Sequence, residues 1–589
     1  MQKKWQVLSD PPQSFYEEHP ELPKIVANLL YNRGIETQEK IDEFLNPDYS
    51  TDIHDPMLFN DMEKAVNRIM SAIEKEERII VHGDYDADGV SGAVIITSFF
   101  RAMGHKNYDV FLPHRETDGY GLNKNTVRLL KDEGANVIIT CDCGVSNVEE
   151  TALANEFGMD VIITDHHSIP AILPKALAII HPKIDGEKYP DKNLAGGAVA
   201  FKLVQGLLTK HQETNELLPN DMKHDGFEKW LLDMVAIASV ADMVPLLGES
   251  RTLTKYGLLV LNKTKRIGLQ KLLLEARLLG ENGETKKELD ADTIGFQIAP
   301  RINAAGRINH ANIAYQLLST NDPIEATDLA LELNKNNNNR KKITENCVKE
   351  ADAQAGQQEG KPVLFVFQEN WPAGVIGLIA GKIKESYQKP TIAMTMNGTD
   401  LVGSGRSVEG FNMIESLQEL PEYFTKFGGH PMACGFSLVN PEVLEDFQTA
   451  LIKKFEEKTK NIDLLPTIDV DAEVNMDNVN WELFDLLQKF EPFGQANPKP
   501  KYIAKGLTVV KVDSIGQDGR HLKMVVKHRS NKTKKLIGWQ LCSDNKEKTN
   551  WCKVLSEGSK IDIVFEIGVN EWNGNRELQL TIVDLKKSK

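Results

Sequence analysis

Hydrophobic and polar positions follow a repeating order along the first half of the chain. Between about residues 60 and 320, short apolar runs rich in β-branched residues occur at 78–82, 137–140 and 160–164. Each run is followed by a stretch with helical spacing. This order is typical of βαβ units, so the sequence predicts a mainly parallel sheet with helices packed on it.

The pattern changes towards the C-terminus. Residues 322–358 have the pattern of one long polar helix, a solvated connector, and a strand-like run at 362–367 opens a second α/β region that extends to about 460. After Pro466 the apolar runs are typical of β-strands, at 502–512, 521–527, 561–569 and 577–583. A small barrel or sandwich of the OB type would accommodate these strands.

The predicted fold class is therefore α/β, with two α/β domains joined by a long helix and followed by an OB-like β domain. The predicted boundaries are 1–60 for an N-terminal extension of short helices and turns, 61–321, 322–358 for the connecting helix, 359–460 and 461–589.

Composition and charge narrow the class of protein. The chain has 589 residues, of which 41% are hydrophobic and 26% charged, and these globular proportions exclude wholesale disorder. No uncharged apolar run reaches the ~18 residues of a membrane span. The net charge of −16 argues only weakly against a nucleic-acid partner, because binding depends on local clusters and not on the sum.

The N-terminus and the cysteines indicate in which cellular compartment the protein works. The first residues include lysines but no apolar segment behind them, so we expect no secretory signal. Six cysteines without a CxxC pair predict reduced thiols and a cytoplasmic protein.

The clearest chemical signal is the segment His82-Gly-Asp84-Tyr-Asp86-Ala-Asp88-Gly89, which follows an apolar strand and precedes a helix expected near Val90. Three carboxylates within five residues repel one another, and a divalent cation would relieve that repulsion. The alternative is a solvated turn whose carboxylates are favoured by the start of the helix.

Acidic and histidine residues recur at the ends of three further apolar runs. Asp142 follows the run at 137–141, Asp165-His166-His167 follows the run at 161–164, and Asp242 ends the run at 234–242. Because the carboxyl ends of parallel strands share one edge of a sheet, we expect six Asp and three His to converge there. That set suits two cations about 3.5–4 Å apart, the usual arrangement for hydrolysing phosphate esters. The alternative is four unrelated polar strand ends.

These residues resemble the four motifs of the DHH phosphoesterase superfamily, which takes its name from the Asp165-His-His167 triplet. Further motifs resemble the RecJ branch of that superfamily, the single-strand-specific 5′→3′ DNA exonucleases: 301–307 (RINAAGR), 403–407 (GSGRS), 427–430 (FGGH) and 491–498 (EPFGQANP). The likeness covers roughly residues 50–589. One departure is Ala496, where the family more often has glycine. The resemblance implies that the two α/β domains are a DHH domain and a DHH-associated domain.

The resemblance also implies roles for individual side chains. Six would hold two divalent ions, Mn²⁺ or Mg²⁺: His82 and Asp86 at one ion, Asp88, His166 and Asp242 at the other, and Asp142 between them. Asp84 and Asp165 would orient these ligands. His167 would face the scissile phosphate, where it either helps to protonate the leaving oxygen or only binds the phosphate.

A second set of residues would hold the substrate. It comprises Arg301, Asn303 and Arg307 in an expected loop, Ser404 and Arg406 in an expected Gly-rich turn, Gly429 and His430, and Arg115 with Tyr120 at the 5′ end of the strand. Arginine makes paired hydrogen bonds to phosphate, and glycines let the backbone approach a ligand. The alternatives are a helix start with solvated arginines, plain hairpin turns, and a tyrosine packed on the sheet.

The OB-like region carries a basic stretch. Residues 520–535 contain seven Lys or Arg and no acid, and 521–527 alternate as a strand with one basic face would. Such a face tracks a nucleic-acid backbone, although a solvated hairpin would have the same composition. Trp539 and Trp551 would either stack on bases or join the core.

The function that the resemblance implies is two-metal hydrolysis of single-stranded DNA from its 5′ end, releasing 5′-mononucleotides in DNA recombination and repair. The implied partners are single-stranded DNA, a single-strand-binding protein and a helicase, and the implied state is a monomer without a membrane partner. Two alternatives remain. One is a phosphodiesterase for short oligonucleotides or cyclic dinucleotides, or a pyrophosphatase, and the other is a non-catalytic replication scaffold.

Overall fold

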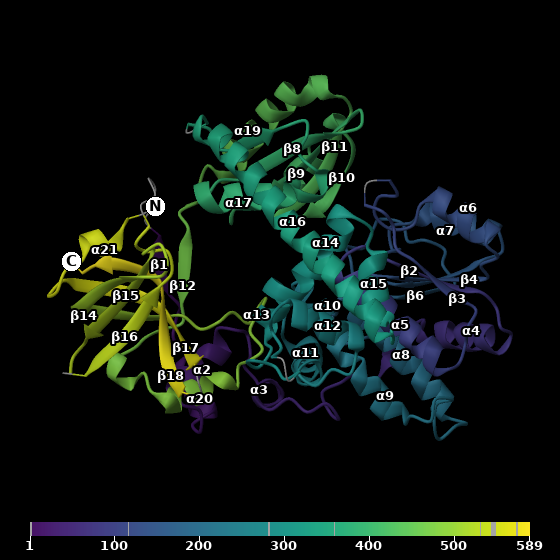
Figure 1. Ribbon diagram of the computed structural model, residues 1–589, viewed down its shortest axis with the longest axis horizontal. Coiled ribbons are helices and arrows are strands. Elements are labelled where there is room, and N and C mark those ends of the chain that lie inside the picture. Colours follow the sequence, from purple (N-terminus) through teal and green to yellow (C-terminus); the bar gives the residue numbers. More distant parts are fainter. Residues whose placement is uncertain are drawn as a thin grey trace. The chain divides into compact units, whose positions relative to one another are not determined.

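A computed structural model describes residues 3–115, 117–280, 283–358, 360–530, 532–543, 549–572 and 575–588 (Figure 1). The chain forms two compact units. The larger unit contains residues 53–244 and 252–464, and the smaller unit contains residues 1–52, 245–251 and 465–589.

The first sheet of the larger unit has five parallel strands. Its strands, in spatial order, are β3 (Tyr108–Phe111), β2 (Ile79–Gly83), β4 (Val137–Cys141), β5 (Asp160–Thr164) and β6 (Ala178–Ile180). The central strands are buried on both faces, which is why their sequences are continuous apolar runs. The sheet confirms the predicted βαβ pattern.

Helices cover both faces of this sheet. The helices α6 (Lys124–Asp132) and α7 (Val148–Glu156) enclose one apolar core, while α4 (Met62–Glu74), α5 (Ala87–Ala102) and α8 (Gly196–Gln212) contact the sheet as a second group. Helix α5 begins at Ala87, three residues before the expected position, because the Asp86 side chain accepts hydrogen bonds from the amides of Asp88 and Gly89.

A helical region follows the first sheet. It comprises α9 (His224–Trp230), α10 (Leu232–Ala241), α11 (Gly248–Leu261), α12 (Ile267–Glu275), α13 (Ala291–Thr293), the π-helix η2 (Ile294–Ile298), α14 (Ala299–Ile308) and α15 (Asn312–Ser319). The long polar helix predicted from the sequence is α16 (Pro323–Gly356), which starts at the cap Asp322 and packs on α12, α14, α15 and α17 (Ala373–Tyr387).

The expected loop at 301–307 is wrong, because these residues lie within helix α14. The small residues Ala304, Ala305 and Gly306 are buried there. A Cβ on Gly306 would lie 2.6 Å from the carbonyl oxygen of Tyr85, so the small side chains permit close packing of the helix and do not open a loop.

The second sheet of the larger unit has the order β10 (Phe424–His430), β11 (Ala433–Leu438), β9 (Asp400–Arg406), β8 (Thr391–Asn397) and β7 (Leu364–Phe367). The helices α16 and α17 share an apolar core with β7, and α18 (Met413–Gln418) and α19 (Leu444–Thr459) share another core with this sheet. Short 3-10 helices lie at Pro421–Tyr423 and Pro441–Val443.

The expected turn at 403–407 is also wrong, because Gly403–Arg406 belong to strand β9. A Cβ on Gly403 would lie 2.2 Å from the ring of Phe436, and one on Gly405 would lie 2.3 Å from the sulfur of Met413. These glycines therefore make room for neighbouring side chains against a strand, a use that composition alone cannot separate from a turn.

The smaller unit contains a closed β-barrel. The strands β14 (Tyr502–Ile515), β15 (His521–Lys527), β16 (Thr533–Gly538), β18 (Asn575–Lys587) and β17 (Lys560–Trp572) follow one another in the sheet, and β14 also pairs with β17. The short strand β13 (Ala472–Glu473) pairs with β14, and α20 (Trp481–Gln488) and α21 (Trp551–Val554) complete the region.

The N-terminal residues belong to the same unit as this barrel. Strand β1 (Lys4–Val7) pairs in parallel with β12 (Thr467–Val470). Side chains from α1 (Gln13–Glu18), α2 (Lys24–Tyr31) and α3 (Gln38–Leu45) join the apolar core of the barrel. Strand β1 was not expected, because four residues of which only Trp5 is partly buried carry too little pattern to distinguish them from a loop.

The expectation of six reduced thiols is wrong for one pair, because Cys542 and Cys552 form a disulfide. The amide of Trp551 donates to the carbonyl of Leu541, which places the two cysteine Cα atoms 5.1 Å apart. Cys141, Cys143, Cys347 and Cys434 are free and buried. None of the helices in the described ranges combines the length and the apolar character that crossing a membrane requires.

Candidate metal centre

The carboxyl ends of neighbouring parallel strands deliver most of the predicted site. In the sheet, Gly83 is paired with Cys141, and Cys141 is paired with Thr164. Asp84, Asp142 and Asp165 therefore leave the sheet at one common edge. Asp242 reaches the same place differently, because the run at 234–242 is helix α10 and not a strand, and Asp242 is its C-cap. A buried helix and a buried strand have equally apolar sequences.

Ligand-type atoms of the described residues converge at this edge in three overlapping groups, each within 4.8 Å. The groups are Asp142 with His166 and His167, Asp88 with His166 and Asp242, and Asp84 with Asp86 and Asp142. The Nε2 atom of His166 lies 3.1 Å from Asp142 Oδ1 and 3.5 Å from Asp242 Oδ2. Asp142 and His166 each belong to two groups, so the groups form one continuous cluster.

Several of these atoms are buried without a hydrogen bond. His82 Nε2, Asp84 Oδ1, Asp142 Oδ1 and His166 Nε2 have no hydrogen-bond partner among the described residues. His166 Nε2 and Asp142 Oδ1 are close enough to bond but are not aligned for it. Two such atoms, which lie close together without a hydrogen bond between them, are arranged as ligands of a cation would be.

The cluster carries more negative charge than its surroundings compensate. Burial, and then the neighbouring carboxylates, raise the pKa values of Asp88 and Asp142 well above the ordinary range. Burial followed by the charge of Asp86 raises the pKa of Asp242 to about 7, and burial lowers the pKa of His166 to about 3. A neutral imidazole among crowded carboxylates is a donor set that fits divalent cations.

The backbone positions two of the carboxylates. Asp88 accepts hydrogen bonds from the amides of Gly196 (2.8 Å) and Gly197 (2.6 Å) at the start of α8. A Cβ on Gly196 would lie 2.5 Å from the Cβ of Asp142, so this position must be glycine. Asp142 itself has a positive φ of 60°, a strained backbone for a non-glycine residue that aims its side chain into the cluster.

Asp165 holds its neighbours and joins none of the three groups. Its carboxylate accepts hydrogen bonds from the amides of His166 and Val145 and from His167 Nδ1 at 2.8 Å. Burial opposes the positive charge of His167, but the hydrogen bond to Asp165 and its charge raise the pKa of His167 to about 9. In the chain without bound cations, His167 therefore keeps its proton near neutral pH.

The contacts of two residues differ from the roles that the sequence predicted for them. The Tyr120 hydroxyl donates to the carbonyl of Asp142 (2.9 Å) and lies 3.1 Å from His167 Nδ1, so it contacts the cluster itself. His82 is fully buried, stacks on Phe111 and lies 3.7 Å from the Cys143 sulfur, but it belongs to none of the three groups among the described residues.

The residues of α14 that were predicted to hold the substrate have different hydrogen-bond partners. Arg301 is bound within the protein, to the carbonyl of Gln297 and to Asn334. Asn303 accepts a hydrogen bond from the amide of Ala87 (2.6 Å), next to Asp86. The Arg307 guanidinium donates to the carbonyl of Gly374.

Further arginines lie near Arg307. Burial, and then the positive charges of Arg115, Arg340 and Arg406, lower the pKa of Arg307 to about 10. Arg115 lies 3.9 Å over the ring of Tyr85. Three guanidinium groups and the carboxylate of Asp86 therefore lie within electrostatic range of Arg307.

The motifs of the second sheet lie on β9 and β10, with β11 between these two strands. Arg406 Nη1 donates to Ser404 Oγ (3.1 Å), and Ser404 Oγ donates to the carbonyl of Cys434 (3.2 Å). Gly429 has a φ of 137° and is paired with Cys434, where a Cβ would lie 2.3 Å from a carbonyl oxygen. Burial, and then the charges of His167 and Lys183, lower the pKa of His430. This places His430 within electrostatic reach of the metal cluster.

Three family models match consecutive parts of the chain. They are the N-terminal domain of the DHH family (residues 78–238), the DHHA1 domain (360–457) and the RecJ OB domain (470–584). The single-stranded-DNA-specific exonuclease RecJ of Bacillus subtilis is 35% identical over 570 residues, which cover 96% of this chain and 68% of the relative. The enzyme of the same name from Haemophilus influenzae is 31% identical, and the matched residues cover 96% of this chain and 96% of that relative. The chain belongs to the RecJ family.

A solved RecJ structure has the same architecture. RecJ from Thermus thermophilus in complex with Mn²⁺ matches with a TM-score of 0.81 at 26% identity, over 100% of this chain and 80% of that chain. The match confirms for this RecJ-family chain the predicted DHH, DHH-associated and OB-like architecture.

Sequence reasoning missed two features of this RecJ-family site. The Gly196-Gly197 pair could have been found, because two adjacent glycines open an apolar helical stretch. Lys183 could not have been found in this way, because a single lysine carries no pattern. Its ammonium donates to the carbonyl of His166 at 2.5 Å.

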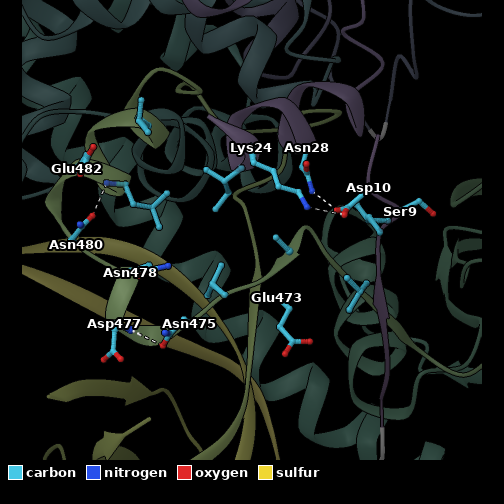
Figure 2. Close-up of a pocket in the computed structure, with 17 residues that line it drawn as sticks. Ser9, Asp10, Lys24, Asn28, Glu473, Asn475, Asp477, Asn478, Asn480 and Glu482 are labelled. Atoms are coloured by element: carbon cyan, nitrogen blue, oxygen red, sulfur yellow. Dashed lines mark hydrogen bonds and ion pairs between the residues drawn. The ribbon is translucent and has the colours of Figure 1, made fainter. Parts of the chain in front are cut away.

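A cavity of about 970 Å³ lies in the smaller unit and contains none of the predicted site residues (Figure 2). Lys24 and Asn28 of α2 point to Asp10 and bond to its carboxylate. Asn475 and Asn480 accept from the amides of Asp477 and Leu483. These polar groups already bond within the protein, unlike the unpaired atoms of the metal centre.

Proposed function

We propose that this chain hydrolyses phosphodiester bonds at the end of single-stranded DNA with the help of divalent cations. The observation that carries the proposal is the convergence of buried carboxylates and an imidazole whose facing atoms have no hydrogen-bond partner among the described residues. Relatives that match nearly the whole chain are named single-stranded-DNA-specific exonucleases, and one was solved with Mn²⁺. A second structure of that protein holds Mg²⁺.

Two cation positions would share the cluster. Asp84, Asp86 and Asp142 would hold one, and Asp88, His166 and Asp242 would hold the other. Asp142 would serve both, because its Oδ1 lies 3.1 Å from Nε2 of His166. His82 remains a proposed ligand of the first position because its buried Nε2 has no partner among the described residues. When bound, two such cations activate a water molecule and stabilise the charge of the attacked phosphate.

The residues around the cluster would position the scissile phosphate and move a proton. His167, protonated and oriented by Asp165 and Tyr120, would donate a hydrogen bond to the phosphate or a proton to the leaving oxygen. Asp165 would keep the imidazole in place and stabilise its charge, because its carboxylate accepts from both the side chain and the amide of His167.

Basic side chains would hold the strand. Arg406, Ser404, Gly429 and His430 of the second sheet, with Arg307 and Arg115, supply charge-assisted donors for backbone phosphates. Arg301 is already bound to Gln297 and Asn334, so we infer that it positions α14 on α16. In the barrel, Lys523 and Lys527 of β15 lie on its outer face while Leu522, Met524 and Val526 point into the core.

The finer features of the function rest on the family resemblance. These are the 5′→3′ polarity, the release of 5′-mononucleotides, a role in recombination and repair, and a monomeric cytoplasmic enzyme that works with a single-strand-binding protein and a helicase. Light scattering of the purified protein tests the monomer, because a dimer would double the measured mass.

The decisive experiment is digestion of single- and double-stranded oligonucleotides labelled at either end, with Mn²⁺, Mg²⁺ or a chelator. The proposal expects a labelled mononucleotide at once from the 5′-labelled single strand, and slow loss of label from the other substrates. Activity in chelator would contradict the metal requirement. Cleavage of dinucleotides without cleavage of longer strands would instead identify a short-substrate phosphodiesterase.

A further inference from the structure

The most exposed large apolar side chain among the described residues belongs to the helical segment that borders the metal cluster. Phe296 is 76% exposed and lies in the π-helix η2, which leads into α14. This π-helix packs on α10, the helix that ends at the proposed ligand Asp242 (Figure 1). Single exposed apolar residues are common on proteins, so the surroundings of this ring decide what it can do.

Phe296 lies on one partly exposed stripe of its helix. Pro300, Asn303 and Arg307 follow it at spacings of four, seven and eleven residues, and none of the three is buried. The residues between them, apart from Gln297, are buried. Side chains at these spacings lie on one side of a helix. The exposed ring therefore points to the same side as Asn303 and Arg307.

The far end of this stripe reaches the metal cluster. Asn303 accepts a hydrogen bond from the amide of Ala87, which follows the proposed ligand Asp86, and Arg307 lies within electrostatic range of Asp86. At a rise of ~1.5 Å per residue, Phe296 is roughly 10 Å from Asn303 along the helix. A strand that leaves the cluster along this stripe would bring a base to the ring within about three stacked nucleotides.

A second exposed apolar side chain lies close to this ring. Met243 directly follows Asp242, is 67% exposed and has a φ of 57°. Its amide donates to the carbonyl of Val240, and a Cβ on Gly295 would lie 3.9 Å from Val240 Cγ1. Met243 and the residue before Phe296 therefore share Val240 as a neighbour. Glycine or asparagine adopts this left-handed backbone more readily than methionine, so the fold keeps a large apolar side chain in water here at a cost.

We propose that Phe296, with Met243 beside it, receives the unpaired bases of the bound strand by stacking and apolar contact. Every base has a face that stacks on an aromatic ring, so this contact is independent of sequence. The bases of a duplex must be opened at a cost before they meet the ring, so the contact favours single strands. The inference rests on the proposed nuclease function. It assigns a source of single-strand preference that a metal centre acting on phosphates cannot supply.

Binding of a labelled single strand in chelator, followed by fluorescence anisotropy, tests the inference without hydrolysis. Phe296→Ala should weaken binding about tenfold, the loss of one base stacked on an aromatic ring. Phe296→Tyr keeps the ring and should bind as the wild type does. Phe296→Leu keeps an apolar side chain without a ring and should bind as weakly as Phe296→Ala. Because the side chain is exposed, all three variants should unfold at the wild-type temperature.

Ile324→Ala is the matched control and should keep the wild-type affinity. Ile324 is 75% exposed, in the first turn of α16. Five residues earlier, the carbonyl of Ser319 accepts a hydrogen bond from Arg101 in the last turn of α5. Asp86 caps the opposite end of α5, so the control removes an equally exposed apolar side chain away from the cluster.

Strands with one abasic position each, which keep every phosphate, identify the base that meets the ring. Removal of that base should weaken wild-type binding about tenfold and leave the affinity of Phe296→Ala unchanged, because both changes delete the same contact. Met243→Asn, which suits the left-handed backbone, should weaken binding without lowering the unfolding temperature.

Three results would overturn the inference: Phe296→Ala binds as tightly as Ile324→Ala, Phe296→Leu binds as tightly as Phe296→Tyr, or every abasic position affects the wild type and Phe296→Ala equally. If Phe296→Ala does not fold, the comparison of the Leu and Tyr variants decides. A wild-type protein that does not bind the single strand would instead contradict the proposed function as a whole.

Discussion

The metal cluster and the basic motifs of the second sheet are built in opposite ways. Asp88 and Asp142 are almost fully buried, and Asp88 is held by two backbone amides at the start of α8. Arg406 donates only to the Ser404 hydroxyl and the Gly405 carbonyl of its own strand among the described residues, and His430 is exposed at the end of β10. The first region is fixed before any ligand arrives, and the second retains donors that can turn towards one.

This difference indicates a division of labour. A rigid group of like charges gains most from cations, so its loss should abolish the chemical step. Exposed or partly bonded cations gain from phosphates, so their loss should weaken substrate binding more than turnover. Variants of the two regions, compared by kcat and KM on one labelled oligonucleotide, test this division.

The largest expected effect is that of Asp142→Asn. The substitution keeps the size of the side chain but removes the charge that two groups of ligands share, so kcat should fall by at least about 10³-fold. The fold should remain, because a buried charge is removed and not added. Gel assays and circular dichroism measure the two results.

Asp132→Asn, at the end of helix α6, is the matched control and should leave kcat unchanged. An Asp142→Asn enzyme that digests single strands at the rate of this control would refute the shared role of Asp142.

The next effect concerns stability and pH. Asp242 has its pKa raised to about 7 in the folded chain by burial and then by Asp86, against 3.8 as an ordinary value. The folded protein without metal therefore holds a proton that the unfolded chain has lost between about pH 4 and pH 7. Its stability should fall as pH rises through that window.

Cations compete with protons for the same carboxylates, so Mn²⁺ should raise the unfolding midpoint more at pH 8 than at pH 5.5. Thermal unfolding with Mn²⁺ or chelator at the two pH values measures this. Equal stabilisation at both would mean that the cation binds away from the cluster.

The sequence predicted the cluster better than the substrate motifs, and the reason is geometric. Strands that end in acids must bring them to one edge, so Asp86, Asp142 and His166 could be grouped without coordinates. A glycine in a sequence does not predict one particular structure in this way. The glycines of 403–407 serve a strand, and Gly306 serves a helix contact, because in both places a neighbour occupies the space of the missing Cβ. The glycine pair at 196–197 is visible in the sequence, but the contact of Gly196 with Asp142, 54 residues away, is not encoded by any local pattern.

A smaller effect is expected for Arg406→Gln. Loss of one charge-assisted contact to a phosphate should raise KM about tenfold and change kcat less than threefold. Steady-state kinetics on a labelled single strand measure both constants, and Arg128→Gln on the surface of α6 is the matched control. A fall in kcat equal to that of Asp142→Asn would place Arg406 in the chemical step and remove the distinction between the two regions.

Substitutions on the basic face of the barrel are expected to have the smallest effect on the rate at saturating substrate. Lys523, Lys527 and Lys535 lie on β15 and β16, where Lys523 and Lys527 have the same orientation and Lys535 is paired with Val525 between them. Replacing all three by Gln should reduce the slope of log affinity against log salt by roughly 0.7 for each lost phosphate contact, and leave kcat nearly unchanged.

The control for this barrel variant replaces Lys64, Lys75 and Lys106. They are exposed and have the same total charge, and Lys75 and Lys106 precede β2 and β3, at the edge of the sheet opposite the cluster. Fluorescence anisotropy with a labelled single strand in chelator, from low to high salt, gives both slopes. If the two triple variants have the same slope, the barrel face does not contact the strand, and the substrate is held by the larger unit alone.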